Sequence, residues 1–208
     1  MAYQSTWYFT DLPEEVIDLV EKDLTENFDN QMDDSKLHGD SLNKNKRNSQ
    51  NAWIPSNHWV AGFLWHYVCR ANKENFLYDL TAIDGESLQY TRYDVGQYYK
   101  WHHDAGIETA YKPIALGNRS EPDARSQDFI NTNIELVRKL SFALQLSDPD
   151  DYEGGNVQLM DEGGNSYIAP RQKGSIMLFD SRTPHRVHKV TRGVRKSIVG
   201  WVVGPRWK

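Results

Sequence analysis

Leu-Ser-Phe-Ala-Leu-Gln-Leu (140–146), Ser-Asp-Pro-Asp-Asp-Tyr-Glu-Gly-Gly (147–155) and Asn-Val-Gln-Leu-Met (156–160) follow one another and carry the pattern that decides the fold. Two short, largely apolar runs flank a polar segment that ends in two glycines. Runs of this length bounded by turn-forming residues are typical of antiparallel strands. We therefore predict two strands joined through a tight turn at Glu153, Gly154 and Gly155, where glycine permits positive φ.

The same texture continues on both sides of this stretch. Short segments rich in aromatic and β-branched residues alternate with Gly and Asp turns from about residue 76 onward. This pattern predicts a series of short antiparallel strands. The predicted strands are residues 76–80, 87–93, 98–103, 140–146, 156–160, 166–168, 175–179, 186–189 and 197–203.

The first third of the chain has helical periodicity instead. Asp11, Pro13 and Glu14 supply a cap, a first-turn proline and an acidic first turn, and apolar residues then recur at helical spacing to about Phe28. A second helix is predicted over 57–71. The polar segments 29–51 and 106–133 are predicted loops, which could close over a substrate or simply form surface.

Two helices followed by eight or nine short strands predict an α+β fold, with a β-sandwich or jelly-roll core buttressed by N-terminal helices on one face. The length of 208 residues fits a single domain with a sizeable core. We predict one domain over 1–208, in which 1–75 is mainly helical support and 76–208 is the jelly-roll core.

Composition excludes several classes of protein. The net charge of −5 gives no basic footprint of the kind that nucleic-acid binders carry. One cysteine, Cys69, excludes an internal disulfide and a site built from several thiolates, and we expect its thiol to be buried. The sequence has no apolar run long enough for a signal peptide or a membrane span, so we expect a soluble, cytoplasmic protein with no membrane partner.

A metal site is indicated by Tyr-Asp-Val-Gly-Gln-Tyr-Tyr-Lys-Trp-His-His-Asp (93–104). On a strand, His102 and Asp104 point to the same face, whereas His103 points away. His185, in Thr-Pro-His-Arg-Val (183–187), can supply a third ligand. Two imidazoles and a carboxylate form the facial triad of non-haem iron(II) oxygenases. Taken alone, a His-x-Asp pair also occurs on solvated turns.

A carboxylate receptor is indicated ten residues after His185. Arg195 and Ser197 share one face of a predicted strand, and a guanidinium beside a hydroxyl can hold a carboxylate by charge-assisted hydrogen bonds. Considered by itself, Arg195 could equally be an arginine in a salt bridge on an exposed strand. Its place after a candidate metal histidine favours the receptor.

Three stretches, 93–104, 140–155 and 178–197, resemble in the same order the prolyl-4-hydroxylase-type (PKHD-like) 2-oxoglutarate/Fe(II)-dependent dioxygenases. The resemblance covers roughly residues 76–203. It implies a double-stranded β-helix (jelly-roll/cupin-like) core. It also implies Fe(II), 2-oxoglutarate and O2, with ascorbate as a candidate additional cofactor.

Carried over by position, the resemblance places iron on His102, Asp104 and His185. It places the far carboxylate of 2-oxoglutarate on Arg195, with Ser197 and Tyr93 as helpers and Tyr99 lining the co-substrate pocket. The family commonly has proline where Asp180 and Lys189 stand, and neither position is implied to touch iron.

The implied activity is hydroxylation of a substrate C–H bond, with a prolyl residue in a peptide or protein as the favoured substrate. A free amino acid or another small metabolite is the alternative. The acidic balance argues against nucleic acid as substrate. A module that binds iron or 2-oxoglutarate without catalysis is a third hypothesis, which the intact set of candidate residues makes the weakest.

Overall fold

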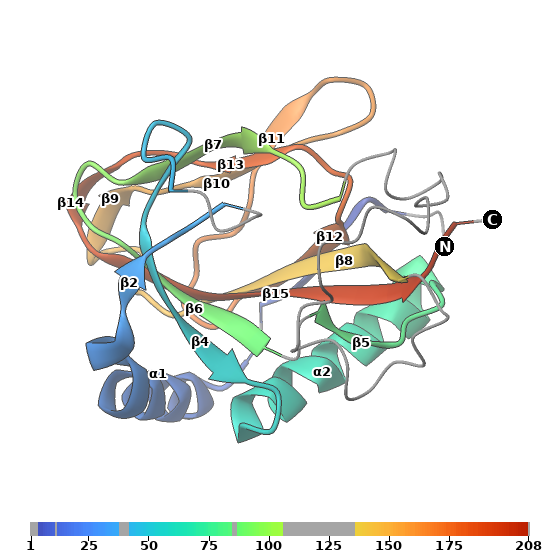
Figure 1. Ribbon diagram of the computed structural model, residues 1–208, viewed down its shortest axis with the longest axis horizontal. Helices are drawn as coiled ribbons and strands as arrows, with labels where there is room; N and C mark the ends of the chain where they lie inside the picture. The colour runs from blue at the N-terminus through green and yellow to red at the C-terminus, as the bar shows by residue number, and fades with distance from the viewer. Residues whose placement is uncertain (1–3, 11, 38–41, 85–86, 106–135, 208) are drawn as a thin grey trace.

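The computed structural model describes residues 4–10, 12–37, 42–84, 87–105 and 136–207 (Figure 1). Asp11, part of the segment 29–51 and all of 106–133 lie outside these ranges. The predicted helix cap at Asp11 and the predicted loop 106–133 are therefore not described.

Two α-helices form as the apolar periodicity predicts. They are α1 (Glu14–Phe28), with Pro13 at its N-cap, and α2 (Trp59–Ala71). The second helix starts two residues later than predicted because His58 is its N-cap, with the ring Nδ1 accepting a hydrogen bond from the backbone N–H of Val60 at 3.4 Å. Short 3₁₀ and π segments follow the two helices, namely η1 (Asp29–Gln31) and η2 (Asn72–Phe76).

The larger sheet is antiparallel and contains eight strands. Its first strand, near the N-terminus, pairs with a strand about 170 positions later in the chain, Thr6 lying opposite Phe179. Its strand order is β1 (Thr6–Phe9), β12 (Ile176–Asp180), β8 (Leu136–Gln145), β15 (Arg195–Pro205), β6 (Ser87–Tyr93), β4 (Gln50–Pro55) and β2 (Asp33–Asp34), with β5 (Ala82–Ile83) paired to β15.

The smaller sheet faces the larger one, and the two helices lie on the opposite side of the larger sheet (Figure 1). This arrangement confirms the α+β class with a jelly-roll core and helices on one face. The smaller sheet has the order β11 (Ser166–Ile168), β10 (Val157–Met160), β13 (His185–Val187), β7 (Tyr98–His102) and β3 (Arg47–Asn48), and β14 (Val190–Gly193) pairs separately with β9 (Tyr152–Gly154).

Side chains alternate between two buried layers because successive residues of a strand point to opposite faces. Leu144 and Ile198 point to the outer face of the larger sheet, where they belong to the same buried cluster as Leu64 of α2. Ala143 and Met177 point to the inner face and pack with residues of the smaller sheet. The space between the sheets is therefore lined by a different set of residues from the helix-packed core.

The predicted strands 87–93 and 166–168 match β6 and β11, and most others overlap an observed strand with shifted ends. The predicted strand 76–80 is wrong, since Phe76 ends η2 and Leu77 adopts the left-handed conformation at φ 54°. The predicted loop 29–51 contains β2 and β3, and the first 75 residues contribute strands to both sheets. The prediction for Cys69 is wrong, because this residue is exposed.

Within the described residues, neither helix combines the length and apolar character that crossing a lipid bilayer requires.

Candidate metal centre and the adjoining cavity

His102, Asp104 and His185 converge between the two sheets. The pairing of β7 with β13 places His102 directly opposite His185. One potential ligand atom from each of the three side chains lies within 4.8 Å of the others. Asp104 Oδ1 lies 3.8 Å from His102 Nε2, and Asp104 Oδ2 lies 3.5 Å from His185 Nε2. The three side chains are 7–9% exposed.

Both imidazoles are held by the backbone through the same ring nitrogen. His102 Nδ1 lies 2.8 Å from the carbonyl of Lys100, and His185 Nδ1 lies 3.0 Å from the carbonyl of Thr183. A carbonyl only accepts hydrogen bonds, so Nδ1 carries the proton and each Nε2 keeps a lone pair. The two lone pairs are thus available on the side where Asp104 lies, which is how imidazole presents itself to a metal.

Asp104 is oriented by the larger sheet. Ser141 of β8 donates a hydrogen bond from its hydroxyl to Asp104 Oδ2 at 2.6 Å. The hydroxyl oxygens of Ser141 and Ser181 lie 3.0 Å apart, and the backbone N–H of Asp104 donates to the carbonyl of Ser181 at 3.0 Å. The carboxylate is therefore held by a hydroxyl of β8, and the backbone of Asp104 by the turn that follows β12, before any metal is considered.

The protonation states of His102 and Asp104 also suit metal binding. Burial, reinforced by the neighbouring His185 imidazole, lowers the pKa of His102 to about 3. Burial alone would raise the pKa of Asp104, but the two imidazoles and the hydroxyl of Ser141 hold it below its ordinary value. Neutral imidazole and ionised carboxylate are the forms in which these side chains coordinate a divalent ion.

The donor set fits a metal site that keeps coordination positions open. Two imidazole nitrogens and one carboxylate on one side of an ion leave coordination positions open for further ligands. This arrangement is typical of non-haem iron(II) centres that bind a co-substrate and dioxygen, and catalytic zinc sites use the same donor types. Closed structural zinc sites instead surround the metal with four protein ligands.

Tyr99 shares the inner face with His102 although it is three residues away. Its ring stacks on the His102 imidazole with centroids 3.5 Å apart and 13° between the planes. Strict alternation would put these residues on opposite faces, but the β7–β13 register shifts between the pairs His185–His102 and Val187–Tyr99. The irregularity brings Tyr99 against the candidate metal ligand.

Arg195 is buried at the start of β15 and is 2% exposed. Its Nη2 donates a hydrogen bond to Gln145 Oε1 at 2.6 Å, and its guanidinium carbon lies 5.6 Å from the centre of the Tyr93 ring. Burial lowers the pKa of Arg195 from its usual high value. Within the described part of the chain, Arg195 Nε and the hydroxyl of Ser197 have no hydrogen-bond partner. Buried donors that lack a hydrogen-bond partner favour binding of an anion.

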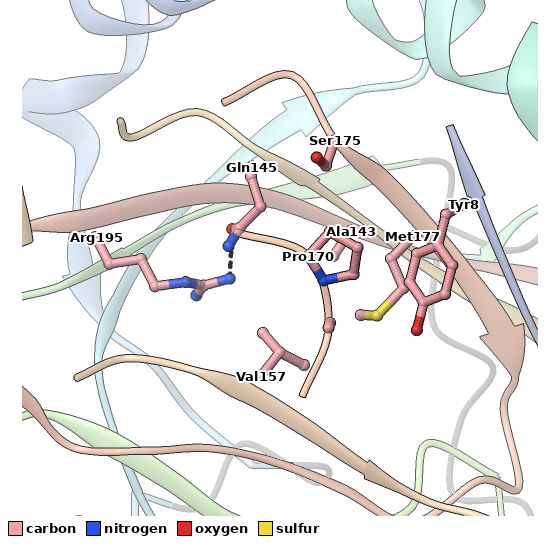
Figure 2. A pocket seen from close by; sticks show the side chains of 9 residues that line it. Tyr8, Ala143, Gln145, Val157, Pro170, Ser175, Met177 and Arg195 are labelled. Atoms are coloured by element: carbon pink, nitrogen blue, oxygen red, sulfur yellow. Dashed lines mark hydrogen bonds between the residues drawn. The ribbon is translucent and has the colours of Figure 1, made fainter. Parts of the chain in front are cut away.

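A cavity adjoins the guanidinium (Figure 2). Arg195 and Gln145 lie at one end and Tyr8 of β1 at the other, with Ala143, Val157 and Met177 among the apolar lining residues. A charged end and apolar walls suit a small ligand that carries a carboxylate.

The predicted site residues therefore fall into two groups. His102, Asp104 and His185 form one, with Tyr99 stacked on it, while Arg195, Ser197 and Tyr93 belong to the other. Sequence reasoning missed Ser141 and Gln145. These polar residues alternate with Leu140, Phe142 and Leu144 in β8, so the period of two in that strand was a signal that could have found them.

His103 points away from the candidate metal ligands, as predicted, and His188 does so too. His103 Nδ1 lies 2.8 Å from the carbonyl of Arg182, and His188 Nε2 lies 2.7 Å from Gln158 Oε1. Trp201 is buried in β15, where the guanidinium carbon of Arg138 lies 4.2 Å from its ring centre.

Residues 88–203 match the sequence model of the 2OG-Fe(II) oxygenase superfamily. A PKHD-type hydroxylase of Synechococcus elongatus is 33% identical over 156 residues, covering 74% of this chain and 60% of that protein. Overall the chain spans between 28% and 60% of the length of the curated relatives it matches.

Solved structures share the fold at low identity. A prolyl-4-hydroxylase of Pseudomonas putida superimposes with a TM-score of 0.65 at 16% identity, covering 98% of this chain and 94% of that one. A prolyl hydroxylase of Trichoplax adhaerens, in complex with a peptide fragment of hypoxia inducible factor, gives a TM-score of 0.71 at 15% identity, covering 95% and 83%. These likenesses confirm the double-stranded β-helix.

The lowered pKa of His102 predicts how the stability of the metal-free protein depends on pH. An unfolded chain protonates a histidine near pH 6.5, whereas folded His102 stays neutral to about pH 3. The unfolded state binds more protons between these values, so the free energy of unfolding falls as pH falls, by up to about 1.4 kcal/mol per pH unit from this group.

Urea unfolding with a chelator present, at pH 7 and pH 5, measures this dependence. His102→Gln should lessen the fall in the free energy of unfolding, whereas replacing the exposed His66 by Gln should not. Equal falls in the parent and His102→Gln would contradict the lowered pKa.

Proposed function

Because the chain belongs to the 2OG-Fe(II) oxygenase superfamily, we propose that it is an Fe(II)- and 2-oxoglutarate-dependent dioxygenase that hydroxylates a substrate C–H bond. The observation that carries this proposal is the convergence of two buried histidines and an aspartate in the space that also holds a buried, incompletely paired arginine. When bound, Fe(II), 2-oxoglutarate and O2 supply the oxidising chemistry, and the co-substrate leaves as succinate and carbon dioxide.

His102, Asp104 and His185 are assigned as the metal ligands. The carbonyls of Lys100 and Thr183 turn the two Nε2 lone pairs toward the site. Ser141 holds one carboxylate oxygen of Asp104 by a 2.6 Å hydrogen bond, which would orient this ligand toward a bound metal. Three protein ligands on one side leave room for a chelating keto acid.

Arg195 is assigned as the residue that binds the far carboxylate of 2-oxoglutarate. Its guanidinium is buried, so an ion pair formed there is weakened little by water. Gln145 fixes the fork through Nη2, and the ring of Tyr93 lies against the guanidinium. Ser197 pairs with Gln145 across the sheet, and this pairing supports its assignment as a further donor to the same carboxylate.

A prolyl residue in a peptide or protein is the substrate that we propose. The printed names of the relatives support this choice, since they are PKHD-type hydroxylases and prolyl hydroxylases, one of them solved with a peptide. A free amino acid or small metabolite is the competing substrate class. We also propose that residues 1–208 act as one catalytic domain, because strands from the first 75 residues complete both sheets.

Removing a metal ligand should abolish turnover without unfolding the protein. Asp104→Ala and His185→Ala are each expected to eliminate 2-oxoglutarate-dependent succinate formation, since two remaining ligands hold Fe(II) poorly. Circular dichroism should still report the folded sheet. His188→Ala is the matched control. His188 follows β13 directly and its ring contacts Gln158 instead of the metal ligands, so this variant should retain activity. Wild-type turnover in either ligand variant would refute the assignment.

Replacing the buried guanidinium should chiefly weaken co-substrate binding. Arg195→Ala is expected to raise the KM for 2-oxoglutarate about 10- to 100-fold, because charge-assisted hydrogen bonds contribute about 1.5–3 kcal/mol. Arg195→Lys should recover part of the loss. The control is Arg192→Ala, which removes an exposed arginine paired with Glu153. An unchanged KM in Arg195→Ala would disprove this role.

A library of proline-containing peptides tests the substrate. Incubation with Fe(II), 2-oxoglutarate and ascorbate should add one oxygen atom to some peptides, detected by mass spectrometry and mapped to proline by fragmentation. His185→Ala should give none. If no peptide is modified while free amino acids stimulate succinate formation, the metabolite alternative replaces the peptide.

A further inference from the structure

The turn between β12 and β13, residues 181–184, touches the candidate metal centre through its backbone. We call it the metal turn. Its four successive carbonyls all accept hydrogen bonds. Two of the donors belong to the candidate ligands Asp104 and His185, and a third belongs to His103, which lies next to two ligands. The bonds are Asp104 N to Ser181 O (3.0 Å), His103 Nδ1 to Arg182 O (2.8 Å), His185 Nδ1 to Thr183 O (3.0 Å) and Met160 N to Pro184 O (3.0 Å).

The conformation of the metal turn is fixed by Asp180, which is 5% exposed. Its Oδ1 accepts hydrogen bonds from the backbone N–H and the Nε of Arg182, at 2.9 and 2.8 Å. Its Oδ2 accepts from Arg182 Nη2 at 2.5 Å and from the Tyr78 hydroxyl at 2.7 Å. Its own carbonyl accepts from Thr183 N at 2.8 Å. One residue thus holds Arg182 and Thr183, the two central residues of the turn.

Aromatic contacts hold this cluster against a distant part of the chain. The guanidinium carbon of Arg182 lies 4.4 Å from the ring centre of Trp207, and the Tyr78 ring meets Trp207 edge to face at 4.5 Å. Lys139 places its ammonium 3.6 Å from the same ring. Asp180 therefore lies in a network of packed aromatic and charged side chains, and this network holds its carboxylate in position beside the metal turn.

We propose that Asp180 is a positioning residue for the metal centre. The proposal rests on the proposed function, because it presumes that His102, Asp104 and His185 bind the metal. Asp180 acts through the metal turn, whose carbonyls set the backbone of Asp104 and the ring of His185. A carboxylate is required because it alone offers acceptors on both oxygens, whereas Asn would turn a donor toward Arg182 or Tyr78.

Cobalt(II) titration of the metal-free protein, without 2-oxoglutarate or peptide, tests the proposal. Asp180→Asn is expected to weaken Co²⁺ binding about 10- to 100-fold, the range measured when a partner of a metal ligand is lost. The visible spectrum of the bound ion should also change, because the ligands are reoriented. A purely structural role would lower only the unfolding midpoint. Wild-type affinity and spectrum in folded Asp180→Asn would overturn the proposal.

Tyr78→Phe keeps the test decisive if Asp180→Asn fails to fold. It removes one hydrogen bond to Oδ2 and should weaken Co²⁺ binding by a smaller factor, and unchanged affinity would again overturn the proposal. Asp94→Asn is the matched control, since Asp94 accepts from Arg92 Nε at 2.9 Å across the same two-residue spacing. Its Co²⁺ affinity should equal that of the parent.

His185→Ala in the same titration distinguishes an error in the metal-ligand assignment from an error in the role of Asp180. If this variant binds Co²⁺ as the parent does, the metal assignment itself is wrong. If it loses binding while Asp180→Asn keeps it, only the role of Asp180 is wrong.

Discussion

The pairing of β7 with β13 is the constraint on which the candidate metal centre depends. It sets His102 opposite His185, although 83 positions separate them in the chain, and leaves Asp104 just beyond the end of β7 to complete the group. A shift of the register by one residue would turn one imidazole to the outer face of the smaller sheet. The register irregularity in this pair also brings Tyr99 onto the ring of His102. The precision of the site is therefore a property of strand pairing rather than of flexible loops.

Polar and apolar layers are kept apart in a way that serves this site. Leu144 faces the helices, whereas its neighbours Ala143 and Gln145 face the space between the sheets. Packing of α1 and α2 against the outer face stabilises the sheet without occupying the inner face. The inner face can then hold groups that would be costly in an ordinary core, including the buried guanidinium of Arg195 and the carboxylate of Asp104.

Local pattern predicted much of this arrangement. The alternation of side chains along a strand was enough to predict that His102 and Asp104 share a face. Aromatic residues between turn-forming residues predicted most of the strands. The pairings with distant partners were not predictable, and β1, β3 and β4 were missed because short or polar strands gain their stability from neighbours far along the chain. Gln145 and Asp180 were passed over for a related reason, since their importance lies in which side chains the fold brings to them. The ligand roles themselves stay predictions.

Tyr8 has a practical implication for handling the protein. Its strand, β1, is the edge of the larger sheet, and its ring lines the end of the cavity opposite Arg195 (Figure 2). An affinity tag fused close to Thr6, or a truncation that removes the first ten residues, would disturb this wall even though every candidate ligand lies more than ninety positions away. Recombinant material is therefore best tagged at a distance from this strand, because loss of activity in a trimmed protein would otherwise be mistaken for a fault in the chemistry.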